Sequence, residues 1–403
     1  MTSAVAAPLS EATRPPAELF DVALLDLDGV VYIGAHAVPG AVEALAAAKA
    51  AGMRLAYVTN NAARPPRVVA EHLDELGIAA TADEVITSSQ AAARYLAERL
   101  DAGARVLVVG TTGLEEALRE RGLVPVSSAE DDPAAVVQGY SPTLDWAQLA
   151  EGAVAINRAL PWVATNIDPT VPSSRGPLPG NGSLVAALRH ATGAQPVVTG
   201  KPDPAMHRET VIRTGAKTPL VVGDRLDTDI EGANAAGCPS LLVLTGVTAA
   251  DELLAAPAAL RPTYLARDLH GLLQAHPAVT RTADRAHCRG WTAHAAGPEL
   301  HLAWDGAACG ESPAADPIDA LRALCVVAWA VADAQAEDGP ADRDDPAGAA
   351  RATDPAGAAG APGNDGRRCT GPSNLAGRAA ARASQVVADD PAASTAVREL
   401  GLE

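Results

Sequence analysis

Two aspartates at the end of an apolar run, Asp26 and Asp28, are the residues of this chain best placed to do chemistry. The run Val22 to Leu25 has the composition of a buried strand, and Gly29 follows the second acid. Residues i and i+2 of a strand share a face, so both carboxylates are expected to enter one crevice at the carboxyl edge of a sheet, where open α/β folds bind ligands. Two carboxylates at such a short distance repel each other unless a cation or a shared proton lies between them. An acidic turn without chemistry is the alternative for so short a pattern.

Further polar motifs stand at expected strand ends or in the loops after them. They are Thr59-Asn60-Asn61, Gly200-Lys201-Pro202-Asp203 and the acidic run from Gly223 to Asp229. Each motif alone is typical of a turn, a loop or a solvated face. Their occurrence in this order, each close to the end of an expected strand, favours a shared site over unrelated turns.

The segments that would position these motifs alternate between strand and helix patterns. The first stretch predicts strands over 22–27, 54–59 and 84–87 with helices near 41–51 and 65–76. Such nearly continuous apolar strands predict a doubly wound parallel sheet that helices cover on both faces. The same alternation continues to residue 245, but reactive strand ends are sparse between about 90 and 195. The sequence therefore predicts an α/β fold in which one sheet is interrupted by an insertion.

Composition narrows the class of protein. At 403 residues the chain is long enough for two or three folded units. Its formal net charge of -18 and its lack of a Lys/Arg cluster argue against a nucleic-acid partner. The five cysteines have no paired spacing, so no zinc site or disulfide framework is predicted and a reducing cytoplasm is expected. Neither a signal-peptide pattern nor an apolar run of membrane-spanning length occurs, so no membrane partner is expected.

Together the motifs resemble those of the haloacid dehalogenase superfamily, and specifically its NagD-like branch. That branch includes 4-nitrophenylphosphatases, phosphoglycolate and glycerol-phosphate phosphatases and the pyridoxal phosphatase chronophin. The quoted residues are Asp26-Leu27-Asp28-Gly29-Val30, Tyr57-Val58-Thr59-Asn60-Asn61, Thr199-Gly200-Lys201-Pro202 and the run from Gly223 to Ile230. The resemblance spans roughly residues 19 to 265 and implies a Rossmann-like core with an inserted α/β cap of the C2 type.

This resemblance divides the chain into segments. The core is expected over 18–88 and 194–270 and the cap over 89–193. Residues 1–17 are expected to be a flexible lead-in, 271–335 a small appended region, and 336–403 a disordered tail with a terminal helix near 374–388. A hairpin around Gly297 and a helix over 318–334 are expected in the appended region, which resembles part of an acetyltransferase fold. Because no acyl-CoA pyrophosphate loop is visible there, we expect no acetyl transfer.

The resemblance also implies roles in phosphate ester hydrolysis. Asp26 would attack phosphorus and form an aspartyl-phosphate, and Asp28 would be the general acid and then the base. A Mg²⁺ ion would be held by the carboxylates of Asp26 and Asp224 and the backbone carbonyl of Asp28. Lys201 would add a second positive charge and Thr59 would hydrogen-bond the phosphoryl oxygens. Asp229 is expected behind these residues, orienting Lys201 or a metal-bound water.

Substrate contacts are expected from both parts of the chain. In addition to Thr59 and Lys201, we expect Asn60 and Asn61 from the core, and Asp168, Gly180 and Asn181 from the cap. The loop from Asp168 to Gly182 is polar and has no aromatic ring, which favours a small polyol or hydroxyacid phosphate, with glycerol 3-phosphate or 2-phosphoglycolate preferred. A homodimer through the cap is the expected protein contact.

Two other functions are open. One is phosphoryl transfer to an acceptor other than water, as in the phosphomutases of the superfamily. Those enzymes generally carry their cap between the first two motifs, whereas only about 30 residues separate Asp28 from Thr59. The other is a phosphometabolite-binding regulatory module without turnover, against which the intact Asp26, Asp28, Lys201 and Asp224 argue.

Overall fold

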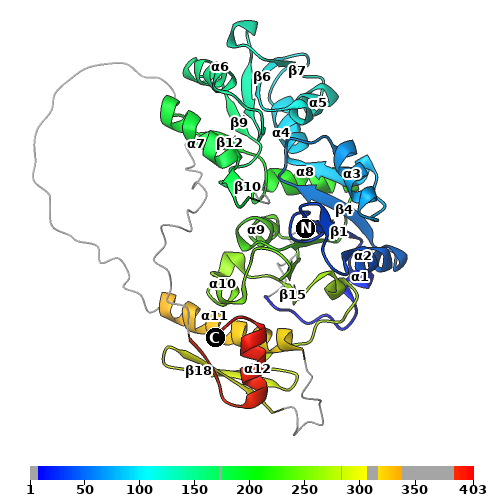
Figure 1. Ribbon diagram of the computed structural model, residues 1–403, viewed down its shortest axis with the longest axis vertical. Coiled ribbons are helices and arrows are strands. Elements are labelled where there is room, and N and C mark those ends of the chain that lie inside the picture. The colour runs from blue at the N-terminus through cyan, green and yellow to red at the C-terminus, as the bar shows by residue number, and fades with distance from the viewer. Residues whose placement is uncertain (1–7, 172–174, 283, 306–315, 338–384) are drawn as a thin grey trace, which may run out of the picture.

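The structure, a computed structural model, describes residues 8–171, 175–282, 284–305, 316–337 and 385–403 (Figure 1). In Figure 1 the inserted segment lies at one end of the molecule, the sheet that carries the N-terminal strand lies in the middle, and the C-terminal segment lies at the other end. Each of these parts is built around its own β-sheet.

The central sheet has six parallel strands in the order β15-β14-β13-β1-β4-β5. Their bounds are Tyr264–Ala266, Ser240–Val243, Pro219–Gly223, Val22–Leu25, Arg54–Thr59 and Val85–Thr87. Alternate residues of β1 enter two different apolar clusters, Ala23 and Leu25 on one side and Val22 and Leu24 on the other. A parallel sheet needs such continuous apolar strands because both of its faces are buried. The prediction of a doubly wound parallel sheet is confirmed.

Helices cover both faces of this sheet. They are α2 (Ala41–Ala50), α3 (Pro66–Glu75), α8 (Pro204–Thr214) and α9 (Glu231–Ala236). Pro66 and Pro204 each stand in the first turn of their helix, where the missing N–H of proline costs no hydrogen bond. These helices begin just after strand ends or loops, so the polar residues before them gather at the carboxyl edge of the sheet.

The insertion forms a second parallel sheet in the order β12-β9-β8-β6-β7. The strands are Val197–Val198, Trp162–Ala164, Ala135–Gln138, Arg105–Val109 and Val124–Val126. Helices α4 (Ser88–Ala97) and α5 (Thr112–Glu120) pack on one face through Ala92 and Leu114, and α6 (Trp146–Asn157) and α7 (Asn181–Thr192) on the other through Ile156 and Leu188. The insertion is thus an α/β layer of its own.

One expected boundary differs from the structure. The second core segment was expected to begin at residue 194, but Val197 and Val198 pair with Val163 and Ala164 of the insertion's sheet. An apolar strand pattern fits either sheet equally well, so it does not indicate which sheet a strand joins. The chain returns to the central part only after β12, in the loop that carries Lys201.

The C-terminal segment forms a sheet in the order β16-β17-β18-β19-β20. The strands are Thr280–Arg281, Arg285–Cys288, Trp291–Ala296, Glu299–Trp304 and Gln385–Ala388. The long helix α11 (Pro317–Glu337) packs on β17 and β18. The expected hairpin around Gly297 and the helix over 318–334 are therefore confirmed.

The prediction that residues 336–403 are disordered is wrong for residues 385–403. Strand β20 pairs in parallel with β19, and α12 (Pro391–Glu399) buries Ala393, Ala396 and Val397 in the cluster that contains Trp291. These small apolar residues cannot form a core alone, but here they cover one that the preceding strands already supply. Residues 338–384 lie outside the described residues, and so does most of the helix expected over 374–388, whose last four residues form β20.

The lead-in is also ordered where the structure describes it. Leu9 is buried, Ala12 pairs with His276 in an antiparallel bridge, and α1 (Pro16–Leu19) precedes the first strand. The expectation of flexibility therefore fails for residues 8–17, because backbone pairing with a distant segment supplies the order that local periodicity lacks. Residues 1–7 lie outside the described part.

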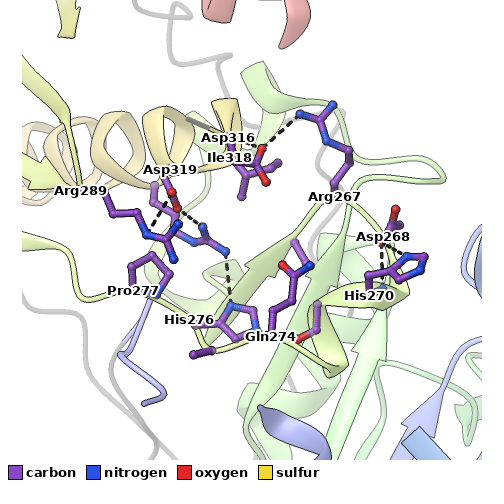
Figure 2. A pocket seen from close by; sticks show the side chains of 14 residues that line it. Arg267, Asp268, His270, Gln274, His276, Pro277, Arg289, Asp316, Ile318 and Asp319 are labelled. Carbon is purple, nitrogen blue, oxygen red and sulfur yellow. Dashed lines mark hydrogen bonds and ion pairs between the residues drawn. The ribbon is translucent and has the colours of Figure 1, made fainter. Parts of the chain in front are cut away.

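The C-terminal unit is joined to the central part by shared core and by buried charge. Leu242 and Leu265 of the central sheet belong to the same apolar cluster as Trp291 and Leu324. Beside this cluster lies a cavity of about 420 Å³, seen in Figure 2.

Charged side chains line that cavity. Arg322 contacts Asp319, donates to the Leu265 carbonyl and lies 3.3 Å from Nδ1 of His276. Arg289 forms a 3.5 Å ion pair with Asp319. Separating the C-terminal unit from the central part would break this network and leave buried charges without partners, which is costly. The network therefore helps to hold the C-terminal unit in its position against the central part.

Candidate active site

Side chains from separate strand ends meet at the carboxyl edge of the central sheet. Asp26 follows β1, Asp224 follows β13, and Lys201 comes from the loop between β12 and α8. Lys201 is 4% exposed; its Nζ contacts the Asp26 carboxylate, donates to Oδ1 of Asp229 at 2.8 Å and to the Val58 carbonyl at 3.2 Å. Buried ammonium and carboxylate groups this close are stable only because each has charged partners. Burial lowers the pKa of Lys201, whereas the neighbouring carboxylates of Asp229 and Asp26 raise it. The net effect is a raised pKa.

The acids outnumber the ammonium group at this point. One oxygen each from Asp26, Asp224 and Asp229 lies within 4.8 Å of the others. Burial raises the pKa of Asp26, and burial together with the neighbouring Asp229 raises that of Asp224 to about 6. A raised pKa means that the ionised form of each carboxyl group is destabilised where it lies. A divalent cation bound between these acids would stabilise the ionised forms.

Asp224 supplies the test of whether a metal ion fits. Its Oδ2 accepts a hydrogen bond from the backbone N–H of Val247 at 2.7 Å. Its Oδ1 is buried and has no hydrogen-bond partner among the described residues. An unpaired buried carboxylate oxygen is costly unless something positive occupies the adjacent space. The donor set is all oxygen, which is what Mg²⁺ prefers, so the residues present fit Mg²⁺.

Asp28 is not one of the three acids of this cluster. It is exposed, and its backbone forms an isolated bridge with Tyr32. The surrounding protein still removes part of its hydration, which raises the pKa of its carboxyl group, while Lys201 and Arg64 lower it by smaller amounts. A raised carboxyl pKa suits a group that alternates between acid and base near neutral pH. Whether its carbonyl oxygen binds the metal stays a prediction.

Asn60 connects the core to the insertion. Its Oδ1 accepts from the backbone N–H of Lys201 at 2.8 Å, and its Nδ2 donates to the Lys201 carbonyl at 3.1 Å and to Oδ2 of Asp168 at 3.2 Å. Its own carbonyl accepts from Ser88 and from the Asn166 side chain, both at 2.7 Å. The Asn60 amide is therefore fully used in holding the Lys201 loop and the Asp168 loop together.

The two neighbours of Asn60 differ from it. Thr59 is buried, and its Oγ1 accepts from the backbone N–H of Asn61 at 3.0 Å. A hydroxyl that accepts one bond keeps its proton free to donate, so Thr59 can still hydrogen-bond an anion at the strand end. Asn61 is exposed and its Oδ1 accepts from the backbone N–H of Ala63 at 2.9 Å, which shapes the turn.

Of the residues expected from the cap, Asp168 is the one that contacts the core. Burial raises the pKa of its carboxyl, and the Arg225 guanidinium and the Asn60 hydrogen bond lower it by smaller amounts. Asn181 is 1% exposed, and its Nδ2 donates to the Asn166 carbonyl at 2.7 Å. At Gly180 an added Cβ would lie 3.0 Å from the backbone of Thr170. Both residues therefore support the Asp168 loop. The Oδ1 of Asn181 has no hydrogen-bond partner among the described residues, so its contact with substrate, like that of Gly180, stays a prediction.

The loop that follows β14 was missed in the sequence. Besides the Val247 amide, Gly246 packs so closely on Asp224 that an added Cβ would lie 2.5 Å from its carboxyl carbon. Thr245 donates through Oγ1 to the Gly29 carbonyl at 2.6 Å. The available signal was a Thr-Gly pair directly after an apolar strand, the same kind of position as the other motifs.

Comparisons with known proteins agree with this geometry. The family model described as haloacid dehalogenase-like hydrolase matches residues 23–124, and a second model, HAD-hydrolase-like, matches residues 198–272. A D-glycerol 3-phosphate phosphatase from Mycobacterium tuberculosis is 54% identical over 258 residues, 64% of this chain and 72% of the relative. A 5'-nucleotidase, YutF, from Bacillus subtilis is 37% identical over 57% of this chain and 89% of its own length.

Solved structures with a similar fold include phosphatases as well. A glycerol phosphate phosphatase from Mycobacterium tuberculosis in complex with magnesium superposes with a TM-score of 0.77 at 39% identity, covering 97% of this chain and 99% of that one. A p-nitrophenyl phosphatase from Archaeoglobus fulgidus superposes with a TM-score of 0.59 at 32% identity, covering 63% of this chain and 98% of that one.

The chain belongs to the haloacid dehalogenase-like hydrolases. The expected likeness to the NagD-like phosphatases is confirmed, and so is the expected core with an inserted α/β unit. A family model described as a GCN5-related N-acetyltransferase-like domain matches residues 288–359, in line with the likeness expected for the appended region. Among the described residues no helix is both long enough and apolar enough to cross a membrane.

Proposed function

We propose that this chain is a Mg²⁺-dependent phosphatase that hydrolyses glycerol 3-phosphate through an aspartyl-phosphate on Asp26. The observation that carries the proposal is the pairing of Lys201 with both Asp26 and Asp229 beside the unpaired Oδ1 of Asp224. This arrangement provides a carboxylate nucleophile, a fixed ammonium charge and a cation site within one group of neighbouring side chains.

In the first half of the reaction, a carboxylate oxygen of Asp26 forms a bond to phosphorus as the bond from phosphorus to the alcohol oxygen breaks. Lys201 offsets charge on the transferring group, and the Thr59 hydroxyl donates to a phosphoryl oxygen. Asp28 gives its proton to the leaving alkoxide, so glycerol departs as a neutral alcohol. The raised pKa of the Asp28 carboxyl, caused by partial loss of its hydration, favours this step because it stabilises the protonated form.

In the second half, water releases the phosphate and restores Asp26. Asp28, now a carboxylate, takes a proton from the water that attacks the aspartyl-phosphate. Asp229 holds Lys201 in place through its 2.8 Å hydrogen bond, and the Arg225 backbone N–H fixes the other Asp229 oxygen at 3.2 Å. Asp26 and Asp224 would hold Mg²⁺, which when bound neutralises charge on the phosphoryl group.

The substrate preference follows from the charge at Asp168. This carboxylate is held toward the core by Asn60, and Arg225, the guanidinium that most affects its pKa, is already paired with Asp227 at 2.8 Å. Hydroxyl groups of a polyol can donate to such a carboxylate, whereas the carboxylate of 2-phosphoglycolate would be repelled by it. This favours glycerol 3-phosphate over 2-phosphoglycolate, although both were expected.

A panel of small phosphate esters tests this preference. The wild-type chain is expected to show kcat/KM at least about tenfold higher for glycerol 3-phosphate than for 2-phosphoglycolate, because like charges brought together cost free energy. Asp168→Asn should narrow that ratio, while Asp227→Asn, a control with a half-exposed carboxylate, should narrow it less. Equal kcat/KM values for the two esters, or a preference for 2-phosphoglycolate, would contradict the proposed substrate.

The alternatives give different results in the same assay. A phosphotransferase would consume the ester slowly until a second alcohol was added, and would then form a new phosphate ester of that alcohol instead of inorganic phosphate. A binding module would bind the ester without releasing phosphate. The relative described as a 5'-nucleotidase makes nucleoside monophosphates a necessary part of the panel.

The proposal extends to location and assembly. We infer that the chain acts in the cytoplasm on a small phosphorylated metabolite, not on nucleic acid or membrane, in keeping with the free Cys238, Cys288 and Cys325. For the cap we propose a homodimer contact at α6, where Trp146 is 82% exposed and Val154 is 43% exposed.

Sedimentation equilibrium checks the homodimer. The wild type is expected to sediment as a dimer, and Trp146→Ser is expected to shift the equilibrium toward monomer. The reason is that a largely exposed tryptophan side chain is typical of a residue that is buried in a protein contact. Val247→Ser is a matched control, since Val247 is also exposed, at 61%, but lies outside the insertion. A wild-type monomer at all concentrations would exclude the contact.

A further inference from the structure

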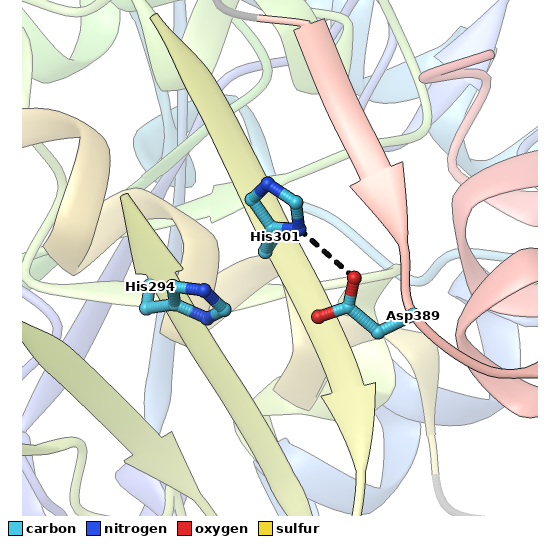
Figure 3. Close-up of side chains that lie close together, drawn as sticks. All are labelled: His294, His301 and Asp389. Carbon is cyan, nitrogen blue, oxygen red and sulfur yellow. Dashed lines mark hydrogen bonds and ion pairs between the residues drawn. The ribbon is translucent and has the colours of Figure 1, made fainter. Parts of the chain in front are cut away.

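Two histidines and an aspartate gather on one face of the C-terminal sheet, a different sheet from the one that carries Asp26. His294 of β18 and His301 of β19 are cross-strand partners, and Asp389 directly follows β20 (Figure 3). One ligand atom from each residue lies within 4.8 Å of the other two. The alternate residues Ala293 and Leu302 are buried in the core cluster, so the histidines occupy the opposite face of the sheet.

We propose that His294, His301 and Asp389, here called the histidine site, bind a divalent transition-metal ion of the Zn²⁺ type. Imidazole nitrogen and carboxylate oxygen are the ligands that Zn²⁺ takes, and three protein ligands leave one position for water. This donor set differs from the all-oxygen cluster at Asp26, which suits Mg²⁺. The two sites are therefore expected to select different ions.

A second carboxylate supports the assignment by its position. His301 Nδ1 lies 2.9 Å from Oδ1 of Asp389, and His301 Nε2 lies 3.6 Å from Oε2 of Glu299. When Nδ1 faces an ion together with Asp389, the Nε2–H is left on the side of Glu299. Histidines that bind metals usually donate their other N–H to a carboxylate or carbonyl, which fixes the tautomer and the ring orientation.

Binding requires a modest rearrangement of His294. The two rings are stacked, with centroids 4.9 Å apart and planes 21° from parallel, whereas ligands of a tetrahedral Zn²⁺ lie about 3.3 Å apart. No hydrogen bond from a described residue holds the His294 ring, so it can turn about its side-chain torsions. Its other cross-strand partner, Arg285, is 52% exposed and pairs with Asp284 at 3.8 Å, so its charge can stay in water.

A bound ion would tie the end of the chain to the sheet. Strand β20 has four residues and, among the described strands, pairs only with β19. Asp389 lies between β20 and α12, so a bond from this residue to an ion shared with β18 and β19 would restrain both elements. Ion binding should therefore be visible as local stabilisation of residues 385–399, independently of catalysis.

Calorimetric titration of the full chain with Zn²⁺ in excess Mg²⁺ tests the site directly. The wild type is expected to bind Zn²⁺, and His294→Ala and Asp389→Asn are each expected to weaken that binding at least about tenfold. His287→Ala is the matched control, because His287 lies on the same face but its Nδ1 is 2.9 Å from Thr292 Oγ1. Asp224→Asn should leave this binding unchanged, which separates it from any Zn²⁺ at the Mg²⁺ cluster.

Hydrogen exchange gives a second measurement that does not depend on activity. Zn²⁺ should slow amide exchange across residues 385–399 in the wild type and in His287→Ala, but not in His294→Ala. Phosphatase activity with Mg²⁺ should match wild type in His287→Ala, His294→Ala and Asp389→Asn, which shows that these three variants fold. The proposal is overturned if wild type and His294→Ala bind Zn²⁺ equally, or if all Zn²⁺ binding is lost in Asp224→Asn.

Discussion

The Asp26→Asn variant is expected to lose Mg²⁺-dependent hydrolysis of phosphate esters by about 10⁴-fold or more, the scale of effect seen when a nucleophile is removed. The physical reason is that an amide oxygen is a poor nucleophile, so no aspartyl-phosphate forms. The measurement is steady-state hydrolysis of 4-nitrophenyl phosphate under saturating Mg²⁺. The variant should remain folded, because Lys201 keeps its 2.8 Å bond to Asp229 and its contact with the Val58 carbonyl.

The matched control for this experiment is Asp227→Asn. Asp227 lies in the π-helical turn Leu226–Ile230 that follows Asp224, but it is half-exposed and paired with Arg225. Its loss should therefore cost little of the rate of 4-nitrophenyl phosphate hydrolysis. If Asp26→Asn retained hydrolysis at a rate comparable with that control, Asp26 would not be the nucleophile.

The second large effect is a contrast between two variants, Asp28→Asn and Asp224→Asn: one is expected to lower kcat and the other to weaken Mg²⁺ binding. Asp28→Asn should lower kcat by about 10²- to 10⁴-fold, the usual contribution of a general acid or base, while leaving the apparent Mg²⁺ affinity within a few-fold of wild type. Asp224→Asn should instead weaken Mg²⁺ binding by about 100-fold or more, because it removes a charged ligand whose Oδ1 has no other partner among the described residues.

Mg²⁺ titration of activity and calorimetry of the substrate-free protein measure these two quantities. The expected pattern is a change in kcat for Asp28→Asn and a change in Mg²⁺ dissociation constant for Asp224→Asn. The reverse pattern, in which Asp28→Asn lost most of the Mg²⁺ affinity, would place the Asp28 carboxylate on the metal and remove it from proton transfer.

The site could be predicted from the sequence where a reactive side chain stands at the end of a strand. Asp26, Thr59 and Asp224 each end or directly follow an apolar strand, and parallel strands bring such positions to one edge. Lys201 was placed in this group by its motif, and the structure supplies the contact with Asp26 and Asp229. The grouping of these residues therefore required only local patterns and the topology of a parallel sheet.

Contacts made by the backbone were not predictable in the same way. Val247 contributes an amide N–H to Asp224, and any residue type can do so, which leaves no mark in the side-chain pattern. The hydrogen bond from Asn181 Nδ2 to the Asn166 carbonyl was not predictable either, because it depends on how the loop backbone folds. Local sequence also gave no sign that residues 385–403 would cover the C-terminal sheet, since the core they complete comes from residues far earlier in the chain.

The central claim is that Asp26 carries the phosphoryl group during turnover, and one measurement tests it most directly. Enzyme mixed with glycerol 3-phosphate and Mg²⁺ is quenched in acid within milliseconds, reduced with borohydride to convert an acyl phosphate into a stable alcohol, and mapped by mass spectrometry. We predict a modified residue at Asp26 in the wild type and none in Asp26→Asn. An unmodified Asp26 throughout turnover, or the modification on another carboxylate such as Asp28, would contradict the account.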